Sequence, residues 1–217
     1  MSTVYTLNGK VLKNAANDKW LTKKEGPGPI ILDPLTIRIK LTSGSTAPTI
    51  SGATVTAVQG QPDVYDVCTA TAGRGKIWGT MLSALTSIEA VIAANPYSAD
   101  GTQDVTAMGG LFKGCTSLTN VALFDTSNVT DMAGMFQNCT ALSVVPLFDT
   151  TNATNIAGMF ENCYNVQSGA LALYQQASTQ TNPPTNHINT FLNCGRDTVT
   201  GAAELAQIPS SWGGTGA

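Results

Sequence analysis

Apolar residues recur at a fixed spacing through the middle of the chain. Three eight-residue segments share the pattern Met/Ile-x-Gly-Met/Leu-Phe-x-x-Cys and begin 24 residues apart: Met108–Cys115, Met132–Cys139 and Ile156–Cys163. The segments that follow the first two, 116–128 and 140–152, also match in their Leu, Val, Leu and Phe positions. Such dense identity at one period indicates a series of equivalent structural units.

Each unit is expected to contain one short strand and one short helix. A strand pattern, with its apolar side chains pointing inward, is formed by Leu118, Val121 and Leu123. The spacing of one helical or 3₁₀ face is shown by Val129, Met132, Met135 and Phe136. A strand and a helix in 24 residues fall within the leucine-rich-repeat range of about 20–29 residues. Because no unit can bury its apolar face alone, the units are expected to stack into a solenoid.

Less regular copies flank the three units. Trp78–Val91 aligns with Met108–Val121, with Leu85 in the place of the cysteine, and a last copy ends at Cys194. The residue before each cysteine of the strict units is Gly or Asn, which is typical of a turn: Gly114, Asn138 and Asn162.

The ends of the chain read as caps. Residues 36–42, 53–58 and 64–69 alternate like strands, and we expect a small sheet that covers the first unit. At the other end, Ser168 is expected to cap a helix over Gly169–Ala177. Nearer the start, the Asn-Gly pair within 7–11 predicts a hairpin, and a second hairpin or turn is expected at 16–21.

The predicted fold is therefore α/β, a short leucine-rich-repeat solenoid with a β-rich N-terminal cap and a helical C-terminal cap. Because the Gly- and Pro-rich segment 25–29 reads as a linker, we place a β-hairpin arm at 1–25. The other predicted domains are a β-rich cap at 26–77, the solenoid at 78–195, and a C-terminal cap or tail at 196–217.

Charge is scarce and unevenly placed. Only 12% of the 217 residues are charged, against about 25% in an average soluble domain. No segment approaches the ~20 apolar residues of a membrane-spanning helix, so we expect no membrane insertion. The first ten residues lack a basic start followed by an apolar segment, so ordinary secretion is not expected.

Residues 1–77 carry nine basic and five acidic residues, whereas 78–217 carry two basic and nine acidic ones. The acidic second part argues against nucleic-acid binding.

Three groups of residues could carry chemistry, and each has a simpler structural explanation. Cys115, Cys139 and Cys163 would stack, but they lack the short paired spacings of metal sites, so buried free thiols are expected. Asp125 and Asp149 would also stack and could hold Ca²⁺, although capping of the following segment explains both. The single histidine, His187, has no motif around it and is expected in a surface or cap role. No cofactor is expected.

The strand ladder is the candidate ligand surface. Its positions between and beside the strand residues are Asn120, Ala122, Phe124, Val144, Pro146 and Phe148. One subset of these side chains lines the core and the other the open surface, and the pattern does not decide which subset contains the two phenylalanines.

The segment Phe124–Leu142, Phe-Asp-Thr-Ser-Asn-Val-Thr-Asp-Met-x-Gly-Met-Phe-x-x-Cys-x-x-Leu, resembles the repeat of BspA-type leucine-rich-repeat surface proteins. The resemblance implies a solenoid that binds proteins or surfaces and is not an enzyme. Two end segments, Tyr5–Asn14 and 169–214, resemble the ends of BspA-repeat proteins encoded by bacteriophages of gut bacteria.

These observations together predict a non-enzymatic structural protein on the surface of a phage particle, as a tail fibre or as a head fibre or capsid decoration. Its solenoid would bind a protein or glycan of the host surface, and it could form a homo-oligomer. Its basic arm would attach to other virion proteins through Lys10, Lys13, Lys19, Trp20, Lys23 and Lys24. The alternatives are a bacterial BspA-like surface adhesin and, more remotely, a glycan depolymerase using two carboxylates.

Overall fold

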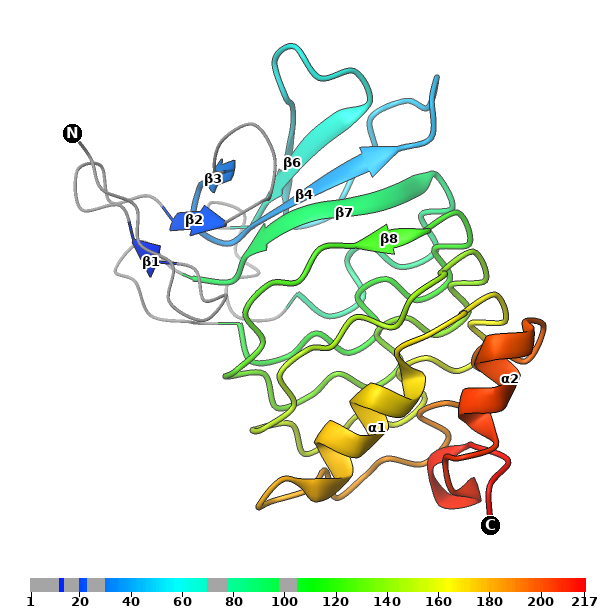
Figure 1. Ribbon diagram of the computed structural model, residues 1–217. Coiled ribbons are helices and arrows are strands. Elements are labelled where there is room, and N and C mark those ends of the chain that lie inside the picture. The colour runs from blue at the N-terminus through cyan, green and yellow to red at the C-terminus, as the bar shows by residue number, and fades with distance from the viewer. Residues whose placement is uncertain (1–11, 14–19, 23–29, 70–77, 98–104) are drawn as a thin grey trace.

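The computed structural model of this protein describes residues 12–13, 20–22, 30–69, 78–97 and 105–217. These residues form a mixed α/β structure with two sheets and two α-helices. Figure 1 shows the coils of the middle region between the larger sheet and the two helices. Within the described residues no helix is long and apolar enough to cross a membrane.

The larger sheet has five strands in the order β5-β6-β4-β7-β8 and does not close into a barrel. Its strands are β4 (Thr36–Leu41), β5 (Thr54–Ala57), β6 (Val64–Cys68), β7 (Ile88–Asn95) and β8 (Asn120–Val121). All neighbours are antiparallel except β7 and β8, which are parallel. The three alternating segments predicted as strands are confirmed as β4, β5 and β6.

A smaller antiparallel sheet has the order β1-β2-β3. Its strands are β1 (Leu12–Lys13), β2 (Trp20–Thr22) and β3 (Ile30–Leu32). The pairing of β1 with β2 confirms the second predicted hairpin, whereas the hairpin predicted at 7–11 lies outside the described residues. Because β2 also pairs with β3, backbone hydrogen bonds join the predicted arm to the segment that follows the predicted linker.

Between residues 105 and 163 the chain forms coils made of successive turns. The short helix predicted in each unit is wrong: no helix begins before α1 (Ala170–Thr179) among the described residues. Alternate amides bond the carbonyl three residues earlier in their own coil, as in Leu111, Lys113 and Cys115. The intervening amides of Gly110, Phe112 and Gly114 donate instead to the next coil, to the carbonyls of Ala133, Met135 and Gln137.

This arrangement explains why the helix pattern is misleading. A spacing of three residues places side chains on one face of a chain of overlapping turns, just as it does on a helix. An α-helix needs every amide to bond four residues back, but here half of those amides have partners on another coil. The chain also turns through left-handed residues, Gly114 (φ 75), Asn138 (φ 63) and Asn162 (φ 62), which confirms the turns predicted before each cysteine.

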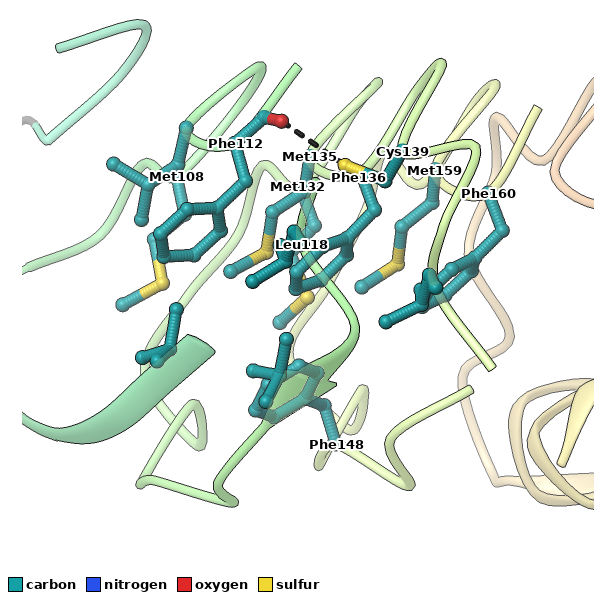
Figure 2. Packing of buried hydrophobic residues seen from close by; sticks show 14 of the residues in the cluster. Met108, Phe112, Leu118, Met132, Met135, Phe136, Cys139, Phe148, Met159 and Phe160 are labelled. Carbon is teal, nitrogen blue, oxygen red and sulfur yellow. Dashed lines mark hydrogen bonds between the residues drawn. The ribbon is translucent and has the colours of Figure 1, made fainter. Parts of the chain in front are cut away.

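The core runs along the coils as a stack of aromatic rings. Phe136 lies between Phe112 and Phe160, with ring centroids 5.4 and 5.2 Å apart and the planes within 16° and 8° of parallel. Phe191 continues the stack at 6.2 Å from Phe160. Figure 2 shows the rings of Phe112, Phe136 and Phe160 beside the methionine side chains. The same positions recur on each coil, so the core is continuous from coil to coil.

The C-terminal end is covered by α1, by α2 (Val199–Leu205) and by a 3₁₀ turn at Ser210–Trp212. The helix predicted at 169–177 is confirmed as α1, but its predicted cap is wrong. The N-cap is Gly169 with φ 98, and its backbone packs too closely against the Val145 carbonyl to leave room for a side chain. The carboxylate of Glu204 on α2 instead accepts hydrogen bonds from the amides of Gly169 (3.3 Å) and Leu171 (3.1 Å).

Replacing Phe136 with alanine should destabilise the protein by about 3–5 kcal/mol, because the cavity would open in the middle of the ring stack. Denaturant unfolding followed by circular dichroism measures this change. Leu123→Ala is the matched control, since Leu123 is exposed and should change stability by less than about 0.5 kcal/mol. Equal effects of the two substitutions would contradict the assignment of Phe136 to a shared core.

Candidate binding surface

The strand side of the coils carries the residues that the sequence assigns to a ligand surface. Strand β8 aligns Asn120 and Val121 with Ala90 and Val91 of β7. On the next coil, Val144 forms a parallel bridge to Ser168. Side chains alternate along these segments, so that Val121 and Val145 are buried while Asn120 and Val144 are exposed.

Phe124 and Phe148 belong to the core. Their ring centroids lie 4.8 Å apart, and Phe148 is 6.0 Å from Phe136. Both side chains are buried, as is Pro146, whereas Ala122 is half-buried. Of the six predicted surface positions, only Asn120 and Val144 are therefore exposed.

The expectation that Leu123 points inward is wrong, and the same holds for Leu147 on the next coil. Leu123 is 60% exposed and Leu147 is 47% exposed. After the bridge at Val144, the Phe148 amide bonds the carbonyl of Pro146 at 3.0 Å. This tight turn puts Leu147 at its tip and directs Phe148 inward. Together with Val144, which is 51% exposed, these leucines form what we call the strand-side row: Leu123, Val144 and Leu147.

The two aspartates considered for Ca²⁺ are used by turns. Asp125 Oδ1 accepts from the Ser127 amide, and Asp149 Oδ1 accepts from the Thr151 amide, both at 2.9 Å. The other oxygen of Asp125 accepts from the Tyr97 hydroxyl, and burial together with this bond raises the pKa of Tyr97. The carboxylates cap turns, not helices. In the described part of the chain, no group of three or more His, Cys, Asp or Glu side chains could hold a metal ion.

All five cysteines are free thiols, and four of them are buried. The thiols of Cys115, Cys139 and Cys163 each donate to a carbonyl of the preceding coil, at 3.2, 3.1 and 3.1 Å. Figure 2 shows the bond from Cys139 to the Phe112 carbonyl. Burial raises the pKa of Cys115 to about 12 and also raises the pKa of Cys139, Cys163 and Cys194. The predicted buried thiol ladder is confirmed.

His187 lies at the C-terminal end of the coils. Its ring stacks on Trp212 with centroids 4.2 Å apart and planes 9° from parallel. Its Nδ1 atom is buried and makes no hydrogen bond within the described residues. This contact attaches the last coil to the C-terminal segment, as a cap role requires.

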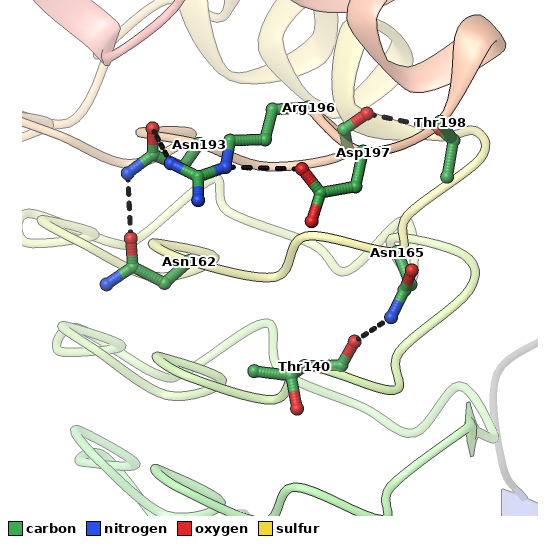
Figure 3. Close-up of polar contacts among 8 residues, drawn as sticks. Thr140, Asn162, Asn165, Asn193, Arg196, Asp197 and Thr198 are labelled. Atoms are coloured by element: carbon green, nitrogen blue, oxygen red, sulfur yellow. Dashed lines mark hydrogen bonds and ion pairs between the residues drawn. The ribbon is translucent and has the colours of Figure 1, made fainter.

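A polar ladder follows the left-handed turn positions on the outside of the coils. Asn162 donates to Asn138 at 3.0 Å, and Asn193 donates to Asn162 at 2.8 Å. Figure 3 shows the end of this ladder, where Arg196 donates to the Asn193 side-chain oxygen at 3.2 Å and pairs with Asp197. The Arg196 guanidinium also lies over the Tyr164 ring, 4.3 Å from its centroid. The three neutral asparagine side chains extend the contact between coils to the surface.

Of the residues predicted to attach the arm, Lys10, Lys19, Lys23 and Lys24 lie outside the described residues. Lys13 and Trp20 are placed only by their backbone, in β1 and β2. Their role in attachment stays a prediction.

The coils, the ladder between them and the caps define a mixed α/β protein built on a sequence repeat. Residues 80–190, slightly more than half of the chain, match the model of a family described as "Mycoplasma protein of unknown function, DUF285". The chain belongs to the DUF285 family, which is consistent with the BspA-type character of its repeats. No curated protein and no solved structure matches the chain.

The four buried cysteines should resist a thiol reagent in the folded protein. Native labelling with a disulfide reagent, followed by peptide mass spectrometry, should modify only Cys68, which is half-buried. Addition of denaturant should release the other four, because only thiolates that reach solvent react. Rapid native labelling of Cys115, Cys139 and Cys163 would contradict their placement in the core.

The raised thiol pKa values also predict a loss of stability in alkali. An unfolded thiol releases its proton near the ordinary pKa of 9.0, whereas folded Cys115 keeps its proton to about 12. The unfolded state therefore binds fewer protons between these two values, and the free energy of unfolding should fall as the pH rises from 9 towards 12. Below pH 9 the contribution is fully present.

Urea unfolding at several pH values measures this slope. Cys115→Ala should make the decline less steep, since one titrating group is removed. An unchanged slope would show that Cys115 is not responsible.

Proposed function

We propose that this chain is a non-enzymatic binding protein whose coils form a short open solenoid and present the strand-side row to a partner on a host-cell surface. The observation that carries the proposal is the exposure of Leu123, Val144 and Leu147 on two adjacent coils that keep their other large apolar side chains buried. Exposed apolar side chains that lie together are typical of interaction sites.

The coils are suited to display because their contacts are internal to the scaffold. Core rings, buried thiols and the ladder of asparagines hold neighbouring coils together, and none of these groups needs the strand-side row. Exposed positions can therefore change without loss of the fold, as is general for binding faces on repeat scaffolds.

The two carboxylates that a glycan depolymerase would need are explained by the capping of turns. Asp125 and Asp149 each accept an amide hydrogen bond within their own turn, which supports a structural role over general acid and base catalysis.

For location, we propose the surface of a phage particle, with the N-terminal arm bound to other virion proteins. The resemblance of the chain's ends to those of phage-encoded repeat proteins supports this proposal, as does the basic balance of residues 1–77. A bacterial surface adhesin is the second candidate, and the family description, which names a Mycoplasma protein, favours it.

Charge on the strand-side row should weaken attachment. The double variant Leu123→Lys with Leu147→Lys should bind whole host cells about tenfold or more weakly, because two apolar contacts would be lost. Flow cytometry with the fluorescently labelled protein measures this binding. Thr116→Lys adds a charge at an exposed position outside the strand-side row and should bind like wild type. Undiminished binding by the double variant, with an unchanged unfolding curve, would refute the role of this row.

Mass spectrometry of purified particles separates the two locations. A virion protein should co-purify with particles at a fixed copy number, in the tens to hundreds for a capsid decoration and lower for a tail fibre. Electron microscopy with an antibody to the chain then places it on the head or the tail. Recovery only in bacterial cell envelopes would favour the adhesin.

A further inference from the structure

A trough of about 490 Å³ crosses the side of the coils that is formed by the turn segments 108–115, 132–139 and 156–163, which we call the turn side. The strand-side row lies on the other side of the core: Phe136 comes from the turn side, Phe148 from the strand side, and their rings meet between the two. A volume of this size is within the range of small-ligand sites, about 300–1,000 Å³. The trough is thus a second surface feature, separate from the row used in the proposed function.

The floor of the trough is formed by the same two positions on three successive coils, and its ends by the side chains at these positions on the coils before and after. Three coils contribute the floor, through Gly109–Gly110, Ala133–Gly134 and Ala157–Gly158. One coil earlier Thr80 occupies the position of Gly110, and one coil later Ile188 occupies that of Ala157, as the ladder of backbone bonds shows. Ile188 is 61% exposed. Larger side chains therefore bound the floor at both ends, which gives the trough a length of three coils.

Hydrogen-bond acceptors of two coils lie over the floor: Asp131 and Gln137 belong to the second coil and Glu161 to the third. A Cβ atom built on Gly109 would be 3.1 Å from Asp131 Oδ2, one on Gly134 would be 3.5 Å from Gln137 Oε1, and one on Gly158 would be 3.0 Å from Glu161 Oε2. Gln137 donates to Glu161 at 2.6 Å, which orients both side chains. Lys113 lines the trough at the first of these coils and supplies an ammonium donor.

The wall side chains differ between coils while the core side chains repeat. Positions 113, 137 and 161 are equivalent and carry Lys, Gln and Glu. By contrast, the core position one residue earlier is Phe in all three coils. The scaffold therefore does not dictate the chemistry of the wall.

We propose that the trough binds a short oligosaccharide. Its polar wall side chains, Lys113, Gln137 and Glu161, repeat with the spacing of neighbouring coils, about 4.8 Å as for adjacent strands, which is close to the advance of a linear pyranose chain per ring. Sugar hydroxyls would donate to Asp131, Gln137 and Glu161 and accept from Lys113. The glycine positions below these groups leave room for a ring to approach the backbone.

An extended peptide fits this spacing less well. Side chains on one face of a strand repeat at about 6.6 Å, so they would not stay in step with the wall side chains at 113, 137 and 161 on consecutive coils. The charge of the trough, two carboxylates against one ammonium, leaves a basic peptide as the competing outcome of the test.

The test uses the full chain with two probes, cellotetraose and chitotetraose, by isothermal titration calorimetry. A lysine-rich decapeptide is the third probe. We expect at least one tetrasaccharide to bind and the peptide not to bind. Failure of both sugars would overturn the proposal, as would binding of the peptide alone.

The trough can be filled without disturbing the fold, because Ile188 already occupies the position of Ala157 on the next coil. The double variant Ala133→Ile with Ala157→Ile should weaken sugar binding by about tenfold or more, since it removes the space over two floor positions. Ala141→Ile, at a half-buried position outside the trough, is the matched control and should bind like wild type. Equal binding by both variants, with matching unfolding curves, would contradict the assignment.

A second double variant distinguishes a neutral sugar from a basic ligand. Asn155 stands at the position of Asp131 on the next coil, and Gln137 at that of Glu161, so amides are accommodated at both sites. The variant Asp131→Asn with Glu161→Gln keeps acceptor oxygens and should retain sugar binding within about tenfold, whereas a basic ligand would lose it entirely. The double variant Leu123→Lys with Leu147→Lys should leave sugar binding unchanged, so failure of the proposed function is distinguishable from failure of this site.

Discussion

Hydrogen bonds between coils are the interaction on which the rest of this structure depends. In each turn segment, only every second amide finds an acceptor three residues back in its own coil, and the amides between them donate to the following coil. A single coil would leave those amides without partners, and a buried unpaired amide costs about as much as a lost hydrogen bond. One coil therefore requires the next. The first and last coils each lack a neighbouring coil on one side. The sheet and the two helices supply hydrogen-bond partners there and cover the core side chains.

The low charge of the chain follows from the same constraint. Equivalent side chains on neighbouring coils are close enough for identical charges to repel. The repeated inward positions hold Phe, Met and Cys, and the outer ladder at Asn138, Asn162 and Asn193 is neutral. Where a charged group recurs, as at Asp125 and Asp149, an amide of its own turn partners it. The stacked thiols also avoid repulsion between like charges, because burial keeps them protonated and neutral. In that form they can donate to carbonyls.

Such a scaffold separates the residues that hold the fold together from those of the two proposed binding surfaces. Core rings, thiols and amides hold the coils together, whereas the strand-side row and the trough use positions that these contacts leave open. This explains why the wall positions 113, 137 and 161 carry three different side chains above an unchanged core. It also explains why two surfaces on opposite sides of one thin core can have different chemistry, one apolar and the other rich in acceptors.

Local pattern was enough to predict several parts of this protein. The period of 24, the buried cysteines, the Gly and Asn turns, the strands β4, β5 and β6, and the position of α1 all follow from residue type and spacing. Pattern does not reveal the partners of the amides, which lie about one coil away in the sequence, so it predicts helices where the chain forms turns. For the same reason the outward side chains of Leu123 and Leu147, the burial of Phe124 and Phe148, the capping of α1 by Glu204 and the trough depend on tertiary structure. Each is decided by which coil or helix lies alongside, and spacing within one segment carries no information about its neighbour.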